Sequence, residues 1–153
     1  MKKTTKIREI GAASNRDFET IFARLREILQ KHSTALTVTA DAPGHYALAG
    51  SAGPAAVRAW GGKVKRPMIP VAWVLIGKAY VSYHLMAVYA DARLRDSMSS
   101  ELRARMQGKS CFNFTTVDEP LFAELDRITQ AGFEPYLALA AEVDNQKAQA
   151  RSR

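Results

Sequence analysis

Three side chains that could do chemistry together are His84, Cys111 and Asn113. A thiol hydrolase uses these residue types as base, nucleophile and orienting group. Cys111 and Asn113 alternate with Phe112 and Phe114, so they share one strand face if the phenylalanines face the core. A reactive thiol needs an electropositive, accessible setting, whereas a cysteine among aromatic residues usually packs as a small hydrophobe. The sequence therefore favours a protein that is not an enzyme.

The element that must position His84 is the stretch 70–86, PVAWVLIGKAYVSYHLM, the longest apolar, β-branched and aromatic run. Its Gly77-Lys78 pair predicts two strands joined by a two-residue turn. That turn makes one side of the ribbon wholly apolar, and we expect this side to meet the core. The apolar side pairs Ile76 with Ala79, Val74 with Val81 and Ala72 with Tyr83. The other side pairs Leu75 with Tyr80, Trp73 with Ser82 and Val71 with His84.

This second side is the candidate ligand or partner face. Tryptophan and tyrosine are common at interfaces because they offer a large apolar area with one polar handle. The alternative is that a tail, a loop or the last helix covers these side chains within the monomer. A second copy of the chain is the most economical partner; the sequence specifies no small ligand, other protein partner, metal or cofactor. The candidate residues are Trp73, Tyr80, Ser82, His84, Cys111 and Asn113.

The remaining elements follow from apolar spacing and from turn residues. They give an α+β chain with element order α-β-β-β-β-α-β-α and about five strands. We expect a helix from Asn15 to about His32, strands at Leu36–Ala40 and Tyr46–Leu48 around a Pro43-Gly44 turn, one or two helices in Ala92–Gln107, a strand at Lys109–Thr115, and a helix from Asp118 to a Schellman ending at Gly132-Phe133. A single domain over residues 15–136 then lies between a flexible basic lead (1–14) and a helical or frayed basic tail (137–153).

Composition limits the classes of function. The chain has 153 residues, a single cysteine and a net charge of +7, from 22 Lys and Arg against 15 Asp and Glu. It shows no apolar run of about 20 residues and no signal-peptide core, so we expect a cytoplasmic protein without membrane contact. Two basic clusters lack any nucleic-acid motif and are interpreted as solvated surface, with weak nucleic-acid binding as a second alternative. They comprise Lys63, Lys65 and Arg66, and Arg93, Arg95, Arg103, Arg105 and Lys109.

The segments VSYHLM and RMQGKSCFNF, with GKAY upstream and EPLFAELDRITQAGFE downstream, resemble the YdhG-like family of small bacterial domains of unknown function. The resemblance runs from the first helix to about Tyr136. It implies a two-layer domain with helices on one face of a largely antiparallel sheet, similar to secretion-chaperone-like folds, many of which dimerise.

One branch of this family includes a frataxin-like protein proposed to handle iron. That role depends on an acidic surface, because iron prefers carboxylate ligands. This chain is basic, and its acids form no dense ridge. The leading hypothesis is therefore a binding protein, and iron handling is the alternative. The acids concerned are Asp17, Glu19 and Glu27 on the first helix and Asp118, Glu119, Glu124 and Asp126 on the last.

Overall fold

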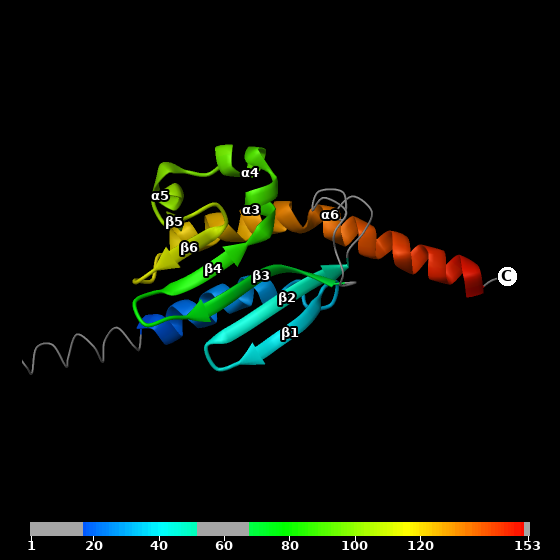
Figure 1. The fold of residues 1–153 in the computed structure, drawn as a ribbon, viewed down its shortest axis with the longest axis horizontal. Coiled ribbons are helices and arrows are strands. Elements are labelled where there is room, and N and C mark those ends of the chain that lie inside the picture. The colour runs from blue at the N-terminus through cyan, green and yellow to red at the C-terminus, as the bar shows by residue number, and fades with distance from the viewer. Residues whose placement is uncertain (1–16, 52–67, 152–153) are drawn as a thin grey trace, which may run out of the picture.

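The computed structural model describes residues 17–51 and 68–151, which form an α+β fold with one six-stranded antiparallel sheet (Figure 1). The first helix covers residues 17–30 and is the unlabelled blue helix of Figure 1. The strands are β1 (Thr37–Ala42), β2 (His45–Ser51), β3 (Met68–Ile76), β4 (Val81–Leu85), β5 (Met106–Gln107) and β6 (Cys111–Phe114). The other helices are α3 (Met86–Ala90), α4 (Ala92–Asp96), α5 (Ser100–Arg103) and α6 (Glu119–Arg151).

The sheet order is β1-β2-β3-β4-β6-β5, and the α+β prediction is confirmed with six strands instead of about five. The extra strand is β5, whose two residues pair with β6. The expected basic lead, the Asn15 cap and the loop with Lys63, Lys65 and Arg66 lie outside the described residues. None of the described helices is long and apolar enough to cross a membrane.

The first helix and α6 pack on the same face of the sheet, and together they enclose the core. One row of side chains runs across the sheet beneath them: Tyr46, Val74, Tyr83 and Phe112 are directly opposite one another on neighbouring strands, and all are buried. The hydroxyl of Tyr83 shares a buried hydrogen bond of 2.6 Å with Thr129 Oγ1 of α6. Phe114 of β6 meets Phe122 of α6 edge to face, with ring centroids 5.1 Å apart.

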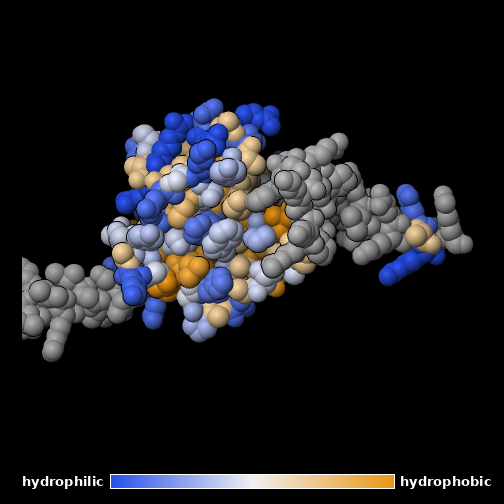
Figure 2. Space-filling model, viewed as in Figure 1, coloured by the Kyte–Doolittle hydropathy of each residue, from blue (hydrophilic) through white to orange (hydrophobic). Residues whose placement is uncertain are grey.

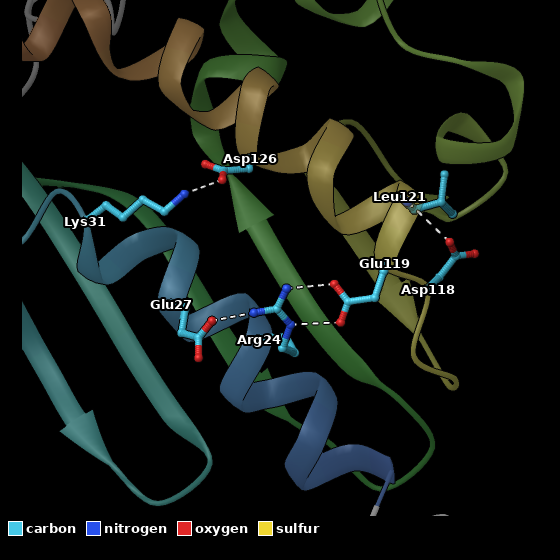
Figure 3. Close-up of polar contacts among 7 residues, drawn as sticks. All are labelled: Arg24, Glu27, Lys31, Asp118, Glu119, Leu121 and Asp126. Atoms are coloured by element: carbon cyan, nitrogen blue, oxygen red, sulfur yellow. Dashed lines mark hydrogen bonds and ion pairs between the residues drawn. The ribbon is translucent and has the colours of Figure 1, made fainter.

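Ion pairs connect the two helices along their length (Figure 3). The guanidinium of Arg24 donates to both carboxylate oxygens of Glu119, at 2.8 and 2.7 Å, and also to Glu27 at 2.5 Å. This arrangement holds the pKa of the Glu119 carboxyl below its ordinary value. About two helical turns further along, the ammonium of Lys31, just after the end of the first helix, pairs with Asp126 of α6. Glu27, Glu119 and Asp126 therefore serve as intramolecular partners of basic side chains.

The segment expected to be one or two helices forms two short helices, α4 and α5. Each has its own N-cap: Asp91 Oδ1 accepts from the Arg93 N–H at 2.9 Å, and Ser99 Oγ accepts from the Leu102 N–H at 3.1 Å. Two adjacent caps divide the segment because each one satisfies the free N–H groups of a new helix start. The helix expected to reach Gln107 ends earlier, since this residue belongs to β5.

The predicted Schellman ending at Gly132-Phe133 is wrong, because α6 continues through both residues and through Pro135 to Arg151. Gly132 has a packing role instead of a terminating one. A Cβ built on it would lie 2.7 Å from the Cβ of Ala87 in α3, closer than two carbons can approach without movement. The missing side chain thus lets α6 and α3 pack in contact, and this tertiary contact overrides the local tendency of glycine to end a helix.

Gly132→Ala tests this packing role. In an unconstrained helix, alanine is more stable than glycine by about 1 kcal/mol. Here we expect the substitution to lower the free energy of unfolding by roughly 1 to 2 kcal/mol, because the new methyl overpacks against Ala87. Urea denaturation measures the change. In an Ala87→Gly background the clash is gone, and Gly132→Ala should be neutral or stabilising; an equal loss in both backgrounds would contradict the contact.

His32 follows the first helix and is held against α6 in the neutral form. Its ring lies edge-on to Phe133, with centroids 4.9 Å apart, and its buried Nε2 has no hydrogen-bond partner among the described residues. Burial lowers the pKa of this imidazole below its ordinary 6.5; Asp126 opposes the shift and Lys31 adds to it. Protonation therefore favours the unfolded chain, in which the imidazole is hydrated.

The free energy of unfolding should consequently fall as the pH drops below about 6.5, because the unfolded chain then binds the His32 proton first. Each unit of pKa depression contributes about 1.4 kcal/mol to this loss. Urea unfolding between pH 7 and pH 5 measures the slope. His32→Phe keeps the ring contact and should make the slope shallower in this interval without abolishing it, because burial also lowers the pKa of His84. An unchanged slope would show that other groups control it.

Candidate functional site

The hairpin that carries the candidate face has a four-residue connection, Gly77 to Tyr80, and the predicted two-residue turn is wrong. The Gly77 N–H donates to the carbonyl of Tyr80 at 2.9 Å, which closes the longer loop. The register is therefore displaced by two residues, so that Trp73 lies opposite His84 and Leu75 lies opposite Ser82. A displacement by two preserves the alternation of faces, because side chains point to the same side every second residue.

Two rows of side chains point away from the first helix and α6, and we call them the outer face. In Figure 1 the strands lie in front of both helices, so the viewer looks onto this side. The first row crosses all six strands: Ala40, Ala47, Trp73, His84, Cys111 and Gln107. The second row crosses five strands: Ala42, His45, Leu75, Ser82 and Asn113.

Five of the six predicted site residues meet on the outer face; Tyr80 does not, because it lies in the hairpin loop. Val71, expected on this side opposite His84, is buried at a register irregularity of β2 and β3. Sequence reasoning missed His45 and Gln107, which were assigned to a turn and to a helix end. The predicted Pro43-Gly44 turn is confirmed, with Gly44 at φ 76°. Because the loop contains only these two residues, His45 is the first residue of β2.

The central side chains of the outer face contact one another in sequence. The rings of Trp73 and His84 are stacked, with centroids 4.6 Å apart and planes 13° from parallel. On the next strand, Cys111 Sγ lies 3.7 Å from His84 Nε2 and donates to Asn113 Oδ1 at 3.3 Å. The Asn113 amide in turn donates to Gln107 Oε1 at 2.6 Å. Trp73, His84, Cys111, Asn113 and Gln107 thus form one continuous cluster.

The electrostatics of this cluster differ from those of an activated thiol. Burial raises the pKa of the Cys111 thiol and lowers the pKa of the His84 imidazole, so both groups are neutral near pH 7. A thiol nucleophile needs the opposite shifts, which create a thiolate beside an imidazolium. Asn113 accepts a hydrogen bond from the thiol and donates one to Gln107, so its amide is directed to these two groups and not to the imidazole that it would have to orient. The arrangement therefore lacks the thiolate–imidazolium pair that activates a cysteine nucleophile.

The outer face carries no formal charge when histidine is neutral, although the chain as a whole has a net charge of +7. Its centre is half-buried, and Leu75 is 37% exposed at its edge. Figure 2, drawn from the same side as Figure 1, shows strongly hydrophilic colour over α4 and α5, and a mixture of blue, pale and orange colours among the strands. Uncharged surface that includes tryptophan and leucine is typical of the centre of a protein interface.

A shallow groove of about 640 Å³ adjoins one edge of the outer face. His45 and Leu75 belong both to the second row and to the lining of this groove, which is completed by Glu19, Phe22, Pro43, Gly44 and Ile76. The lining of the groove is mainly apolar. Because Glu19 and Phe22 belong to the first helix, the groove extends the outer face towards that helix. Among residues 17–51 and 68–151, no group of three or more His, Cys, Asp or Glu is placed to hold a metal ion.

Comparison of the chain with models of known families, with curated proteins and with solved structures finds no match. The candidate site is therefore defined by the geometry of the outer face alone. That geometry supplies an aromatic pair, a neutral thiol and amide groups on a surface without charge.

The alkylation rate of Cys111 tests whether the thiol is activated. In the native protein we expect slow reaction with iodoacetamide at neutral pH, and a rate that rises with pH up to an inflection above 9.0, the ordinary value. In urea the inflection should move down towards that value. His84→Phe should leave the native profile without an inflection near neutrality. A plateau below pH 7 that His84→Phe abolishes would instead reveal a thiolate–imidazolium pair and favour an enzyme.

Proposed function

We propose that this chain is a non-catalytic, cytoplasmic binding protein of the YdhG-like type, and that it forms a homodimer through the outer face. The observation that carries the proposal is the row Trp73–His84–Cys111, which lies half-buried on an uncharged sheet surface with its titratable groups in neutral form. A surface of this kind has side chains suited to contact and lacks an activated group.

Charge favours a second copy as the partner. Two chains that each carry +7 repel one another, and this repulsion is weakest where the facing surfaces are uncharged. A two-fold dimer brings the same patch of both copies together, so each row would face its own counterpart. Apolar and aromatic side chains are self-complementary in such an arrangement, whereas like charges directly opposite one another are not.

Trp73 is the expected anchor of the interface. Its ring lies at the centre of the first row, and the flat stack with His84 holds it in place. A rigid aromatic side chain loses little conformational freedom on association, which is one reason why tryptophan dominates many interfaces. Leu75 and the adjoining groove supply apolar area beside it.

The two alternative functions have weaker support. For iron handling, three acids that could serve as ligands, Glu27, Glu119 and Asp126, are paired with Arg24 and Lys31. For nucleic-acid binding, acids interrupt the described basic cluster at Asp96 and Glu101, and Asp91 pairs with Arg93 at its start. The cluster consists of Arg93, Arg95, Arg103, Arg105 and Lys109. In neither case do like charges form a dense patch, whereas the uncharged and aromatic side chains of the outer face lie together.

Light scattering tests the homodimer, in a buffer that contains EDTA so that only the chain itself can account for association. We expect the mass of two chains, falling towards one chain on dilution. Trp73→Ala should raise the dissociation constant by at least about 30-fold, which corresponds to the 2 kcal/mol loss of an interface hot spot. Tyr89→Ala is the matched control, because Tyr89 is an exposed aromatic residue on α3 and lies outside the outer face.

The control variant should dimerise as the parent chain does. A single-chain mass at the highest soluble concentration, or equal weakening by both substitutions, would contradict a dimer through this face. Urea unfolding of Trp73→Ala checks that the monomer itself remains folded.

A further inference from the structure

Cys111 and His84 present two metal-ligating atoms to the same point of the outer face. Sγ and Nε2 lie 3.7 Å apart on directly opposed residues of β6 and β4. In tetrahedral zinc sites, Zn–S is about 2.3 Å and Zn–N about 2.0–2.1 Å, which places the sulfur and nitrogen roughly 3.6 Å apart. The pair therefore spans one edge of a zinc tetrahedron almost without adjustment. The described residues of one chain add no third His, Cys, Asp or Glu, so one chain provides half a site.

We infer that two copies of this chain bind one zinc ion between their outer faces, with Cys111 and His84 of each copy as its four ligands. This inference rests on the proposed homodimer. A two-fold axis that passes beside these residues relates the two identical pairs, and a cation on the axis meets two sulfurs and two nitrogens. Two Cys and two His form one of the common closed ligand sets of structural zinc.

The charge balance of the site suits its surroundings. On binding, each Cys111 thiol releases its proton to solvent and becomes a thiolate, so two protons leave for each zinc ion bound. Two thiolates neutralise the Zn²⁺ charge, and the two imidazoles bind in their neutral form. The complete site is therefore uncharged and can be enclosed between two uncharged faces without the cost of burying a net charge. Because the thiols must lose protons, affinity should rise with pH.

The neighbouring side chains support this ligand geometry. The Trp73 ring, stacked on His84, restricts rotation of the imidazole and so helps to direct Nε2 towards the sulfur. In the metal-free chain, Asn113 Oδ1 accepts a hydrogen bond from the Cys111 thiol, and Asn113 Nδ2 donates one to Gln107 Oε1. When the thiol becomes a thiolate, half-turns of both amides would let Asn113 Nδ2 donate to the sulfur and Oδ1 accept from Gln107. Such hydrogen bonds from outer groups stabilise metal ligands.

Cobalt(II) is the probe, because it occupies tetrahedral zinc sites and absorbs visible light there. Titration of the chelator-treated chain should give a sulfur-to-cobalt charge-transfer band that saturates at one ion per two chains. Zinc should abolish the band by displacement. Cys111→Ser should remove the charge-transfer band, and His84→Gln should weaken binding and alter the tetrahedral spectrum. Glu101→Gln is the matched control: it removes an exposed carboxylate, another possible metal ligand, that lies on α5 outside the outer face, and it should leave the titration unchanged.

The outcomes separate this inference from the proposed function. A dimer in EDTA that gives no cobalt band overturns the zinc site and leaves the homodimer standing. One ion per chain, or an equal loss of binding in Glu101→Gln, also overturns the shared site. A dimer that forms only with zinc, at one ion per two chains, supports the inference and contradicts the proposal that the chain dimerises without metal. A single chain with and without zinc contradicts both.

Discussion

The rest of the structure depends on the contact between one row of sheet side chains and the helices above it. Tyr46, Val74, Tyr83 and Phe112 fill the space between the sheet and the helix layer, and the Tyr83–Thr129 hydrogen bond pairs two hydroxyls that are fully buried there. A strand directs neighbouring side chains to opposite sides, so burying this row forces the alternate residues outward. The outer face is thus a direct consequence of core packing, and its residues do not have to contribute to the core.

This dependence explains what sequence could predict. The pattern of apolar residues assigned Trp73, Ser82 and His84 to the correct side although the register was displaced, because a shift of two residues keeps the alternation. The pairing of Cys111 and Asn113 on the same side followed from their alternation with phenylalanine in the same way. The register itself depends on the Gly77–Tyr80 loop, whose length is not determined by the Gly-Lys pair alone.

Other features could not be predicted, because they depend on contacts between distant segments. Gly132 has the local signature of a helix end, yet the proximity of Ala87 gives it a packing role within α6. Gln107 reached the outer face because β5 pairs with β6 over two residues, too short a strand for an alternating pattern to reveal. The neutrality of Cys111 and His84 is likewise a property of their enclosure: the same two residue types in a more exposed, electropositive position would favour a nucleophile.

The bidentate contact of Arg24 with Glu119 joins residues 95 positions apart in the chain, and Lys31 is joined to Asp126 across the same separation. The helix layer is therefore made from the first and the last elements of the fold. During synthesis the complete sheet emerges from the ribosome before α6 does. At that stage only the first helix is available to cover its apolar row. Closure of the core must wait until α6 has been synthesised, so a chain truncated before α6 would expose Tyr83 and Phe112 to solvent and to other chains.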